Sequence, residues 1–459
     1  MGFLNKLAEL KEWKRGVTHC TFDPHGPGVV RIHLIPPKFK LFGNPSYTVI
    51  LNGYYVLPIG NSWAIILSAF MREVNKFDRK IISDKDAEFI YGNTVKYVSR
   101  AYPFTDKKQI SQDLDVILDI LFDVARGNTD HPDLERLSIR QYAPCMSAPH
   151  RMDLAISSMT DGKGCWNCNQ KCVFCYAAEQ KMANVKELDT EGWKKVIDRL
   201  KKAHVPMVTF TGGEPTVRKD LTELVAYAKE FVTRVNTNGT LLTDELIRGL
   251  VDAGLDSIQI TLYSHDEKIH NALVGVEKFD ATVSGIKTAV KHGLDVSINT
   301  PLCSLNRDYG KTLEFIQSLG VKYCTASGLI CTGSAAENHG AYDLNADELY
   351  GIISNAKSFC NENSMEIDFT SPGLITAEKL EELSMNVPSC GAALSNMAIA
   401  PDGTVVPCQS WLGADAGLGN VLELPFSKIW NNKKCIELRS MTDEEAQRCP
   451  FRAERSKNG

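Results

Sequence analysis

The chain has 459 residues, of which 43% are hydrophobic and 23% are charged, as in ordinary globular proteins. Its formal charge of −5 and its isoelectric point near 6.1 give no electrostatic reason to expect nucleic acid or a membrane surface as a partner. The N-terminal sequence MGFLNKLAELKEWKRG is charged throughout and does not have the pattern of a secretory signal peptide. We therefore expect a cytoplasmic protein of about three domains.

An uncharged stretch covers residues 41–71 and is long enough to span a bilayer. Asn, Pro and Gly residues interrupt it repeatedly, and a membrane-spanning helix could not satisfy its backbone around so many of them. The run YTVILNGYYVL at 47–57 instead predicts a β-hairpin that turns at Asn52-Gly53. No membrane partner is expected.

Three helices are expected after this hairpin. The first starts at Ser62 and runs to about Phe77, and the second covers 84–101 after Ser83. The third begins near Thr105 and ends before the glycine at 127, with apolar residues spaced along one face. The pattern predicts a winged-helix-like domain within residues 1–127, followed by a Pro- and Asp-rich linker at 128–150.

Strand and helix patterns alternate from residue 151 onwards. Strands are expected near 152–157, 206–210, 232–236, 256–261, 294–299 and 322–330, with helices near 189–204, 220–230, 243–253, 280–292 and 308–319. Repeated β–α units imply a parallel sheet with right-handed crossovers. Six units are too few for an eight-stranded barrel, so the α/β fold expected over 151–340 is a partial (β/α)6 barrel.

Fourteen cysteines in a chain without a secretion signal favour metal binding over disulfides. Cys168, Cys172 and Cys175 form a CxxxCxxC motif after the first strand, with the aromatic Phe174 before its last cysteine. Three thiolates can hold three corners of a four-iron, four-sulfur cluster and leave its fourth iron free. The alternative is a structural zinc site, because Cys165 adds a second CxxC pair and a fourth thiolate.

Polar residues follow the ends of the next strands. Gly212, Gly213 and Glu214 come after the strand MVTF, and glycines there let a backbone approach a ligand closely. Further along, Asn238, Thr261 and Asn299 stand at or after the ends of three later strands, at the mouth of the barrel where such folds bind ligands.

The last seventy residues contain four more cysteines. Cys390 and Cys408 flank an Asp402-Gly403 turn, which fits a hairpin that brings two thiols together, and Cys449 lies ten residues from the end. Cys435 lies in a predicted helix, where it either supplies a further ligand or faces the core. The remaining cysteines fit ordinary small apolar side chains.

The CxxxCxxC motif followed by Gly-Gly-Glu-Pro resembles the radical S-adenosylmethionine (radical SAM) enzymes over residues 151–340. The resemblance implies a catalytic 4Fe–4S cluster on Cys168, Cys172 and Cys175, and S-adenosylmethionine as the source of a 5′-deoxyadenosyl radical. It also implies cofactor contacts from Phe174, Gly212, Gly213, Glu214, Asn238, Thr261 and Asn299. One departure is Val274-Gly275, where related enzymes often have an Arg-Gly pair that could hold the cofactor carboxylate.

The flanking segments have resemblances of their own. Residues 341–459 are similar to the SPASM or twitch extension, which implies one auxiliary iron–sulfur cluster on Cys390, Cys408 and Cys449, without the fourth cysteine expected shortly after Cys449. The order of elements over 40–127 resembles the PqqD-like fold, a peptide-recognition element. Its alternative is an N-terminal cap without a binding role.

Together these resemblances imply a maturase of ribosomally made peptides, which would form crosslinks or thioethers, epimerise residues or excise backbone. The implied partners are a precursor peptide and a one-electron reductant of the flavodoxin or ferredoxin type. Two rivals stay open: a radical SAM enzyme for a small molecule or another protein, and a non-catalytic zinc-bound peptide-binding module. The sequence identifies no catalytic residue beyond the cofactor contacts.

Overall fold

The computed structural model describes residues 19–22, 30–36, 47–53, 55–77, 82–125, 139–143, 146–160, 166–338, 340 and 342–450. The chain divides into two compact units, Met1–Ala148 (unit 1) and Pro149–Gly459 (unit 2). Cys145 and Cys165 lie outside the described residues. None of the helices in the described part of the chain is long and apolar enough to cross a membrane.

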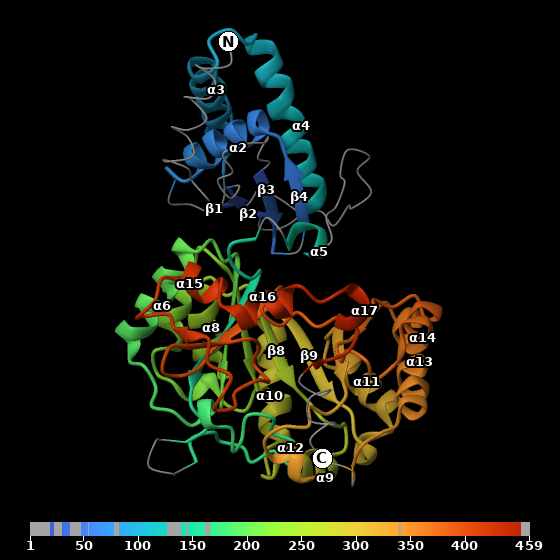
Figure 1. Cartoon of the computed structure of the whole chain (residues 1–459). Helices are drawn as coiled ribbons and strands as arrows, with labels where there is room; N and C mark the ends of the chain where they lie inside the picture. Colours follow the sequence, from blue (N-terminus) through green and yellow to red (C-terminus); the bar gives the residue numbers. More distant parts are fainter. Residues whose placement is uncertain are drawn as a thin grey trace. The chain divides into compact units, whose positions relative to one another are not determined.

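Unit 1 is an antiparallel sheet packed against helices (Figure 1). The strands follow chain order across the sheet: β1 (His19–Phe22), β2 (Val30–Ile35), β3 (Tyr47–Leu51) and β4 (Tyr55–Ile59). The helices are α2 (Asn61–Val74), α3 (Asp84–Ala101), α4 (Lys107–Ala125) and the short α5 (Ile139–Tyr142). One buried apolar core joins both layers, with Ile32 and Leu51 from the strands, Ile65 and Met71 from α2 and Leu114 from α4.

The local signals of unit 1 act largely as predicted. Asn52 and Gly53 turn the β3–β4 hairpin with φ of 51° and 71°. Ser83 caps α3 by accepting a hydrogen bond from the backbone N–H of Asp86. Helix α2 begins at Asn61, one residue before the predicted Ser62. Its N-cap residue is Gly60, which makes no side-chain hydrogen bond to the helix. The sheet also contains β1 and β2, two strands in addition to the predicted hairpin.

Unit 2 is built on one ten-stranded sheet in the order β11-β10-β9-β8-β7-β6-β5-β12-β13-β14. Its parallel strands are β5 (Arg151–Ser157), β6 (Met207–Gly212), β7 (Val232–Thr237), β8 (Ser257–Thr261), β9 (Asp295–Pro301), β10 (Tyr323–Ser327), β11 (Glu366–Phe369) and β12 (Asn396–Ile399). The antiparallel strands β13 (Thr404–Val406) and β14 (Gly419–Asn420) extend its edge. The six predicted strands are present, and β11 adds a seventh consecutive parallel strand beyond them.

Helices and short 3₁₀ turns connect these strands (Figure 1). The helices are α6 (Thr190–Lys202), α7 (Leu221–Tyr227), α8 (Asp244–Asp252), α9 (Glu267–Val274), α10 (Phe279–Lys291), α11 (Tyr309–Ser318), α12 (Ser334–Glu337), α13 (Ala346–Glu362), α14 (Ala377–Glu382), α15 (Phe426–Trp430), α16 (Lys433–Arg439) and α17 (Asp443–Ala446). The turns are η2 (Lys181–Ala183), η3 (Pro215–Val217) and η4 (Ser304–Asn306). The predicted helices correspond to α6, α7, α8, α10 and α11.

The parallel strands of unit 2 alternate between apolar and polar side chains. One set is buried and apolar, and includes Val208 and Phe210 of β6, Val235 of β7 and Ile258 and Ile260 of β8. The intervening residues are polar and line a cavity instead. Strands buried on both faces usually form continuous apolar runs, so this alternation indicates an inner face built to bind something polar.

Candidate active site

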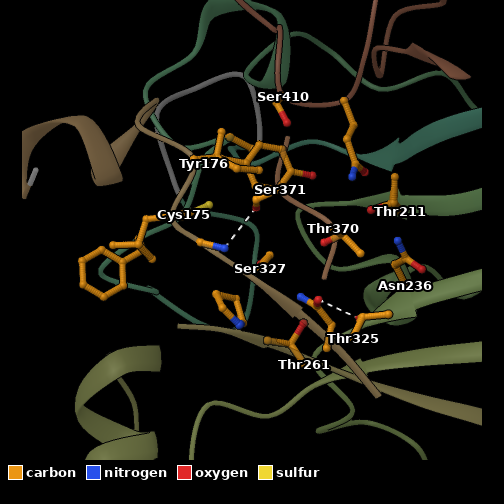
Figure 2. A pocket seen from close by; sticks show the side chains of 18 of the residues that line it. Cys175, Tyr176, Thr211, Asn236, Thr261, Thr325, Ser327, Thr370, Ser371 and Ser410 are labelled. Carbon is orange, nitrogen blue, oxygen red and sulfur yellow. Dashed lines mark hydrogen bonds between the residues drawn. The ribbon is translucent and has the colours of Figure 1, made fainter. Parts of the chain in front are cut away.

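One cavity of about 1140 Å³ lies on the inner face of unit 2. Its walls include the six cysteines predicted as cluster ligands, namely Cys168, Cys172, Cys175, Cys390, Cys408 and Cys449, although the sequence separates the two groups by more than two hundred residues. In Figure 2, Cys175 and Tyr176 lie on one side of this pocket, and Thr211 and Asn236 lie on the other. The two predicted cysteine groups therefore share one chamber.

The loop of residues 168–175 carries the first three cysteines (the loop cysteines). Burial raises the pKa of Cys168 to about 12, and burial together with Cys175 and Cys168 raises the pKa of Cys172. Such thiols stay protonated unless a metal stabilises the thiolate. In the described residues, no three His, Cys, Asp or Glu side chains lie close enough together to hold one metal ion. Three thiols around a chamber fit a cluster, because each thiolate then binds a different iron.

The C-terminal end of α9 supports this loop from behind. The backbone N–H groups of Lys171 and Val173 donate to the carbonyls of Val274 and Leu273 at 3.0 and 2.9 Å. Gly275 ends α9 in the left-handed region with φ 70°, and a Cβ there would collide with the carbonyl oxygen of Lys171. Related enzymes often have an Arg-Gly pair at this position; in this chain Val274-Gly275 occupies it and supports the loop through backbone contacts.

Gly212 and Gly213 let the end of β6 approach β5 and the cysteine loop. Gly212 has φ 137°, and a Cβ there would collide with the carbonyl of Ser157. A Cβ on Gly213 would lie 2.9 Å from the carbonyl of Ser158 and 3.4 Å from Cβ of Cys168. The Gly213 N–H donates to Ser157 O at 2.8 Å. The main role of the two glycines is therefore to let the end of β6 pack closely against the end of β5. Both still line the cavity.

Glu214 and Asn238 join the ends of β6 and β7. The buried carboxylate of Glu214 accepts hydrogen bonds from the hydroxyls of Thr216 and Thr237, both at 2.6 Å, and from the Asn238 N–H at 2.8 Å. Burial raises its pKa. The Asn238 amide donates to Asn169 Oδ1 at 2.6 Å, inside the cysteine loop. Both side chains line the cavity and hold its wall together.

The other predicted cofactor contacts also lie on the cavity wall. Phe174, Thr261 and Asn299 line it, from the cysteine loop, β8 and β9. Asn299 accepts a hydrogen bond from Thr325 at 2.9 Å (Figure 2). The Phe174 ring packs edge-on against Tyr342, with centroids 5.3 Å apart. Sequence reasoning thus identified residues of one site.

Cys390, Cys408 and Cys449 (the auxiliary cysteines) meet through the hairpin of β12 and β13. Asp402-Gly403 forms its turn, with Gly403 at φ 89°, as predicted. The Cys390 N–H donates to Ala446 O at 2.6 Å, which ties the segment before β12 to α17, close to Cys449. Burial raises the pKa of Cys408 to about 12, and proximity to Cys390 and Cys449 adds to this.

Two other cysteines differ in their surroundings. Cys435 is fully buried in α16, where burial raises its pKa to about 11 against a hydrogen bond with Arg439, and it does not line the cavity. Of the two options left open for Cys435, the structure places it in the core. Cys331 was expected to be an ordinary apolar residue, but it is half-buried and lines the cavity. Cys303, Cys324 and Cys360 are buried as expected.

Gln180 connects the two cysteine groups, and no sequence pattern predicts this contact. Its amide nitrogen donates to Tyr176 O at 2.5 Å, next to the cysteine loop, and to Ser410 O at 3.2 Å, next to Cys408. Its amide oxygen accepts from the Leu412 N–H at 3.1 Å. A single buried amide thus fixes the spacing of the loops that carry Cys175 and Cys408.

Known proteins share these features. Residues 167–316 match the family model "Radical SAM superfamily", and residues 390–450 match "Iron-sulfur cluster-binding domain". The chain is 30% identical over 294 residues to an Fe-coproporphyrin III synthase of Methanosarcina barkeri, covering 58% of this chain and 73% of that one. This chain belongs to the radical SAM superfamily. It is also 27% identical over 297 residues to an AdoMet-dependent heme synthase of the same organism, covering 61% and 82%.

Solved structures share the fold of this radical SAM enzyme. The structure of Streptococcus suis SuiB bound to the precursor peptide SuiA has a TM-score of 0.57 at 15% identity and covers 86% of this chain and 88% of that one. Native anSMEcpe with bound AdoMet has a TM-score of 0.51 at 17% identity, covering 66% and 86%. At such identities the likeness concerns the fold.

Membership of the superfamily settles the cofactor class. This radical SAM enzyme uses a 4Fe–4S cluster and S-adenosylmethionine, and its C-terminal domain binds auxiliary iron–sulfur. The residues present suit these groups, because two sets of three thiols open into one cavity among glycine turns and polar strand ends. The zinc-module reading is therefore not retained, although its fourth thiol, Cys165, lies outside the described residues.

The support from α9 leads to a stability prediction. Gly275→Ala is expected to lower the free energy of unfolding by about 1–3 kcal/mol, because it forces a left-handed alanine against the Lys171 carbonyl. It should also reduce the iron bound after anaerobic reconstitution. The matched control is Gly293→Ala, which has a similar φ of 74° but open space around the new methyl group. Equal iron content and stability in the two variants would contradict the prediction.

Proposed function

We propose that this radical SAM enzyme is a maturase that modifies a ribosomally made peptide by hydrogen abstraction. The observation that carries the proposal is the shared chamber, where the loop cysteines and the auxiliary cysteines face the same 1140 Å³ cavity. The cavity lies slightly above the usual range of small-molecule sites, which is about 300–1,000 Å³, and it has to hold the clusters and S-adenosylmethionine as well as a segment of the substrate.

In this proposal the residues of the chamber have separate tasks. Cys168, Cys172 and Cys175 hold the catalytic cluster, and Cys390, Cys408 and Cys449 hold an auxiliary one. When bound, the catalytic cluster and S-adenosylmethionine supply a 5′-deoxyadenosyl radical that removes a hydrogen atom from the substrate. The protein supplies position and excludes water. Gln180 keeps the two cysteine groups in register.

Cofactor contacts belong to the strand ends. Thr261 and Asn299 offer polar groups at the ends of β8 and β9, and Phe174 closes the wall next to the cysteine loop. Glu214 and Asn238 position the backbone of their turns, since their own polar atoms are occupied by protein partners. A reductant of the flavodoxin or ferredoxin type would deliver the electron.

Unit 1 supports a peptide substrate. The fold likeness to SuiB covers more of the chain than unit 2 contains, so it extends into unit 1. Strand β4 pairs with β3 on one side only in the described sheet, and the β3–β4 hairpin contains no charged residue. An extended peptide can add to such an edge as a further strand. We therefore assign residues 40–127 a PqqD-like role in binding the leader segment.

A second candidate function is chemistry on a tetrapyrrole. The curated relatives at 27–30% identity are named Fe-coproporphyrin III synthase and AdoMet-dependent heme synthase. These sequence matches favour a small-molecule substrate for the same cavity. The two functions differ in whether unit 1 is needed for substrate binding.

The test is co-expression of the enzyme with short open reading frames that neighbour its gene, followed by mass spectrometry of each peptide. A mass change that requires the intact loop cysteines supports the peptide proposal. In parallel, the reconstituted enzyme is incubated anaerobically with Fe-coproporphyrin III, S-adenosylmethionine and a one-electron reductant. Conversion of the porphyrin, with every peptide unchanged, would replace the proposal by the second candidate.

Removal of residues 1–148 gives a quantitative prediction. The truncated enzyme keeps the whole ten-stranded sheet and both cysteine groups, so its uncoupled cleavage of S-adenosylmethionine should persist. Its affinity for the modified precursor should fall at least about tenfold, because several backbone hydrogen bonds to β4 are lost. Isothermal titration calorimetry measures this loss. Unchanged affinity would show that unit 1 does not bind the leader segment.

A further inference from the structure

Two arginine side chains line the cavity from β5 and β7, and they differ in their partners. Arg151 forms an ion pair with Asp153, with Nε 2.9 Å from Oδ1. Arg234 donates only a long hydrogen bond, from Nε to Ser257 Oγ at 3.4 Å. Within the described part of the chain, no carboxylate lies within ion-pair distance of Arg234. A half-buried guanidinium without a carboxylate is unusual inside a protein.

Two neutral groups next to Arg234 also lack partners. Thr209 pairs with Arg234 across β6 and β7, and Asn236 lies two residues further along β7 on the same face. Thr209 Oγ1 and Asn236 Oδ1 are buried and make no hydrogen bond to any described residue. The Thr209 side chain is only 1% exposed. The Thr209 hydroxyl, which has no protein partner, and the Arg234 guanidinium, which has no carboxylate within ion-pair distance among the described residues, thus lie on the same part of the cavity wall.

Asp368 of β11, a carboxylate that also lines the cavity, is not the missing acceptor. The Tyr323 hydroxyl donates to Asp368 Oδ2 at 2.7 Å, so this carboxylate already has a partner. Burial lowers the pKa of Arg234 and the positive charge of Arg151 lowers it further, whereas Tyr323, Asp295 and Asp153 act from farther away in the opposite direction. Arginine nevertheless stays protonated in proteins, so Arg234 presents to the cavity a positive charge that no described carboxylate contacts directly.

We propose that Arg234, assisted by Thr209, binds a carboxylate of the substrate on the inner face of the barrel. The planar guanidinium fork matches a carboxylate with two parallel hydrogen bonds, and the Thr209 hydroxyl adds a third donor. The inference rests on the proposed function in naming the source, which is an Asp or Glu side chain of the precursor peptide. Such a contact would select which residue lies within reach of the radical.

The depth of Arg234 in the barrel separates this contact from cofactor binding. Arg234 is the third residue of β7 (Val232–Thr237), whereas Asn238 and the cysteine loop meet beyond the end of that strand. A carboxylate bound to Arg234 therefore lies deeper along the strands than the residues assigned to S-adenosylmethionine. The cofactor carboxylate is the competing ligand, and the experiment includes it.

The test measures binding of capped pentapeptides to the reconstituted full-length enzyme by isothermal titration calorimetry at millimolar peptide. The probes are acetyl-Gly-Gly-Glu-Gly-Gly-amide, its isosteric Gln analogue, the Gln peptide with a free C-terminal carboxylate, and coproporphyrin III. We expect the Glu probe to bind at least about tenfold more tightly than the Gln probe. That ratio should fall to near one in Arg234→Gln and be partly restored in Arg234→Lys.

Control variants separate recognition from folding. Arg248→Gln removes an exposed arginine from α8 and should keep the wild-type ratio. Thr209→Val removes the unpartnered hydroxyl at constant volume and should lower the ratio less than Arg234→Gln does. Equal binding of the Glu and Gln probes, or a preference that survives Arg234→Gln, overturns the inference. So does a loss of affinity for S-adenosylmethionine in Arg234→Gln, since Arg234 would then hold the cofactor.

The remaining arms distinguish the sources of the carboxylate. Preference for the free C-terminal carboxylate supports the site and changes its source from a side chain to a peptide end. Arg234-dependent binding of coproporphyrin III alone supports carboxylate binding but contradicts the peptide function. If a co-expressed precursor is modified but the enzyme binds the Glu and Gln probes equally, the proposed function holds and the role proposed for Arg234 is wrong.

Discussion

Replacement of Cys168, Cys172 and Cys175 by alanine is expected to abolish reductive cleavage of S-adenosylmethionine. Each cysteine holds a different iron in the proposed cluster, and no other described cysteine lies between them in the loop. Burial raises the pKa of Cys168 and Cys172, so these thiols stay protonated when no metal is bound. Formation of 5′-deoxyadenosine, measured by chromatography after anaerobic reduction, reports the loss.

The matched control for this triple variant is Cys360→Ala. Cys360 is fully buried in α13 and does not line the cavity, so its replacement costs only packing, about 1 kcal/mol. It should retain 5′-deoxyadenosine formation and full iron content. Cys165→Ala is expected to be far milder than any change in the loop cysteines. Normal 5′-deoxyadenosine output from the triple variant would refute the assignment of the catalytic cluster.

Much of the site could be predicted because its chemistry depends on short-range spacing. The CxxxCxxC motif, the glycines at the end of β6 and the Asp402-Gly403 turn are local patterns; the cysteines of the motif line the cavity, and the glycines and the turn have the expected backbone geometry. The parallel strands were equally visible, since their alternation with helices is a local feature too. Local sequence therefore identified the wall of the cavity and the order of its strands.

Contacts between distant segments were not predictable in this way. Gln180 joins Tyr176 to Ser410 across more than two hundred residues, and a single glutamine carries no periodic signal. Gly275 was noted only as half of a missing Arg-Gly pair, whereas its role is to approach the Lys171 carbonyl. The short strand β11 follows the long helix α13 and was missed, because four residues carry too little periodicity.

The polar inner face is an intermediate case, and it bears on function. Thr209, Arg234 and Gln259 occupy alternate positions in strands whose other residues are buried and apolar. This alternation is readable in the sequence, but its meaning depends on knowing that the apolar face is packed in the core while the polar face lines a cavity. Once the fold is known, the same pattern indicates which residues can meet a substrate.

The auxiliary site allows a sharp prediction because Cys408 and Cys435 have different surroundings. In the background of the Cys168, Cys172 and Cys175 triple alanine variant, the remaining iron–sulfur signal should come from the auxiliary cluster alone. Cys408→Ala should remove that signal, because Cys408 faces the cavity together with Cys390 and Cys449. Cys435→Ala should leave it unchanged, because Cys435 is buried in α16 against Arg439. Electron paramagnetic resonance and iron content measure both.

The outcome also decides whether the auxiliary cluster has an open iron. Arg439, next to Cys435, donates hydrogen bonds to Trp430 O at 2.7 Å and to Ala393 O at 3.3 Å, so Cys435→Ala could disturb the fold around the hairpin. Cys435→Ser keeps a hydrogen-bonding group for Arg439 and serves as the control. Loss of the signal in both Cys435 variants would demonstrate that Cys435 is a fourth cysteine ligand, and the auxiliary cluster would then have no open iron. If the signal persists in both variants and changes only when precursor peptide is added, a substrate group binds the iron that Cys390, Cys408 and Cys449 leave free. A cysteine thiolate of the peptide is the group that iron–sulfur chemistry favours as this ligand.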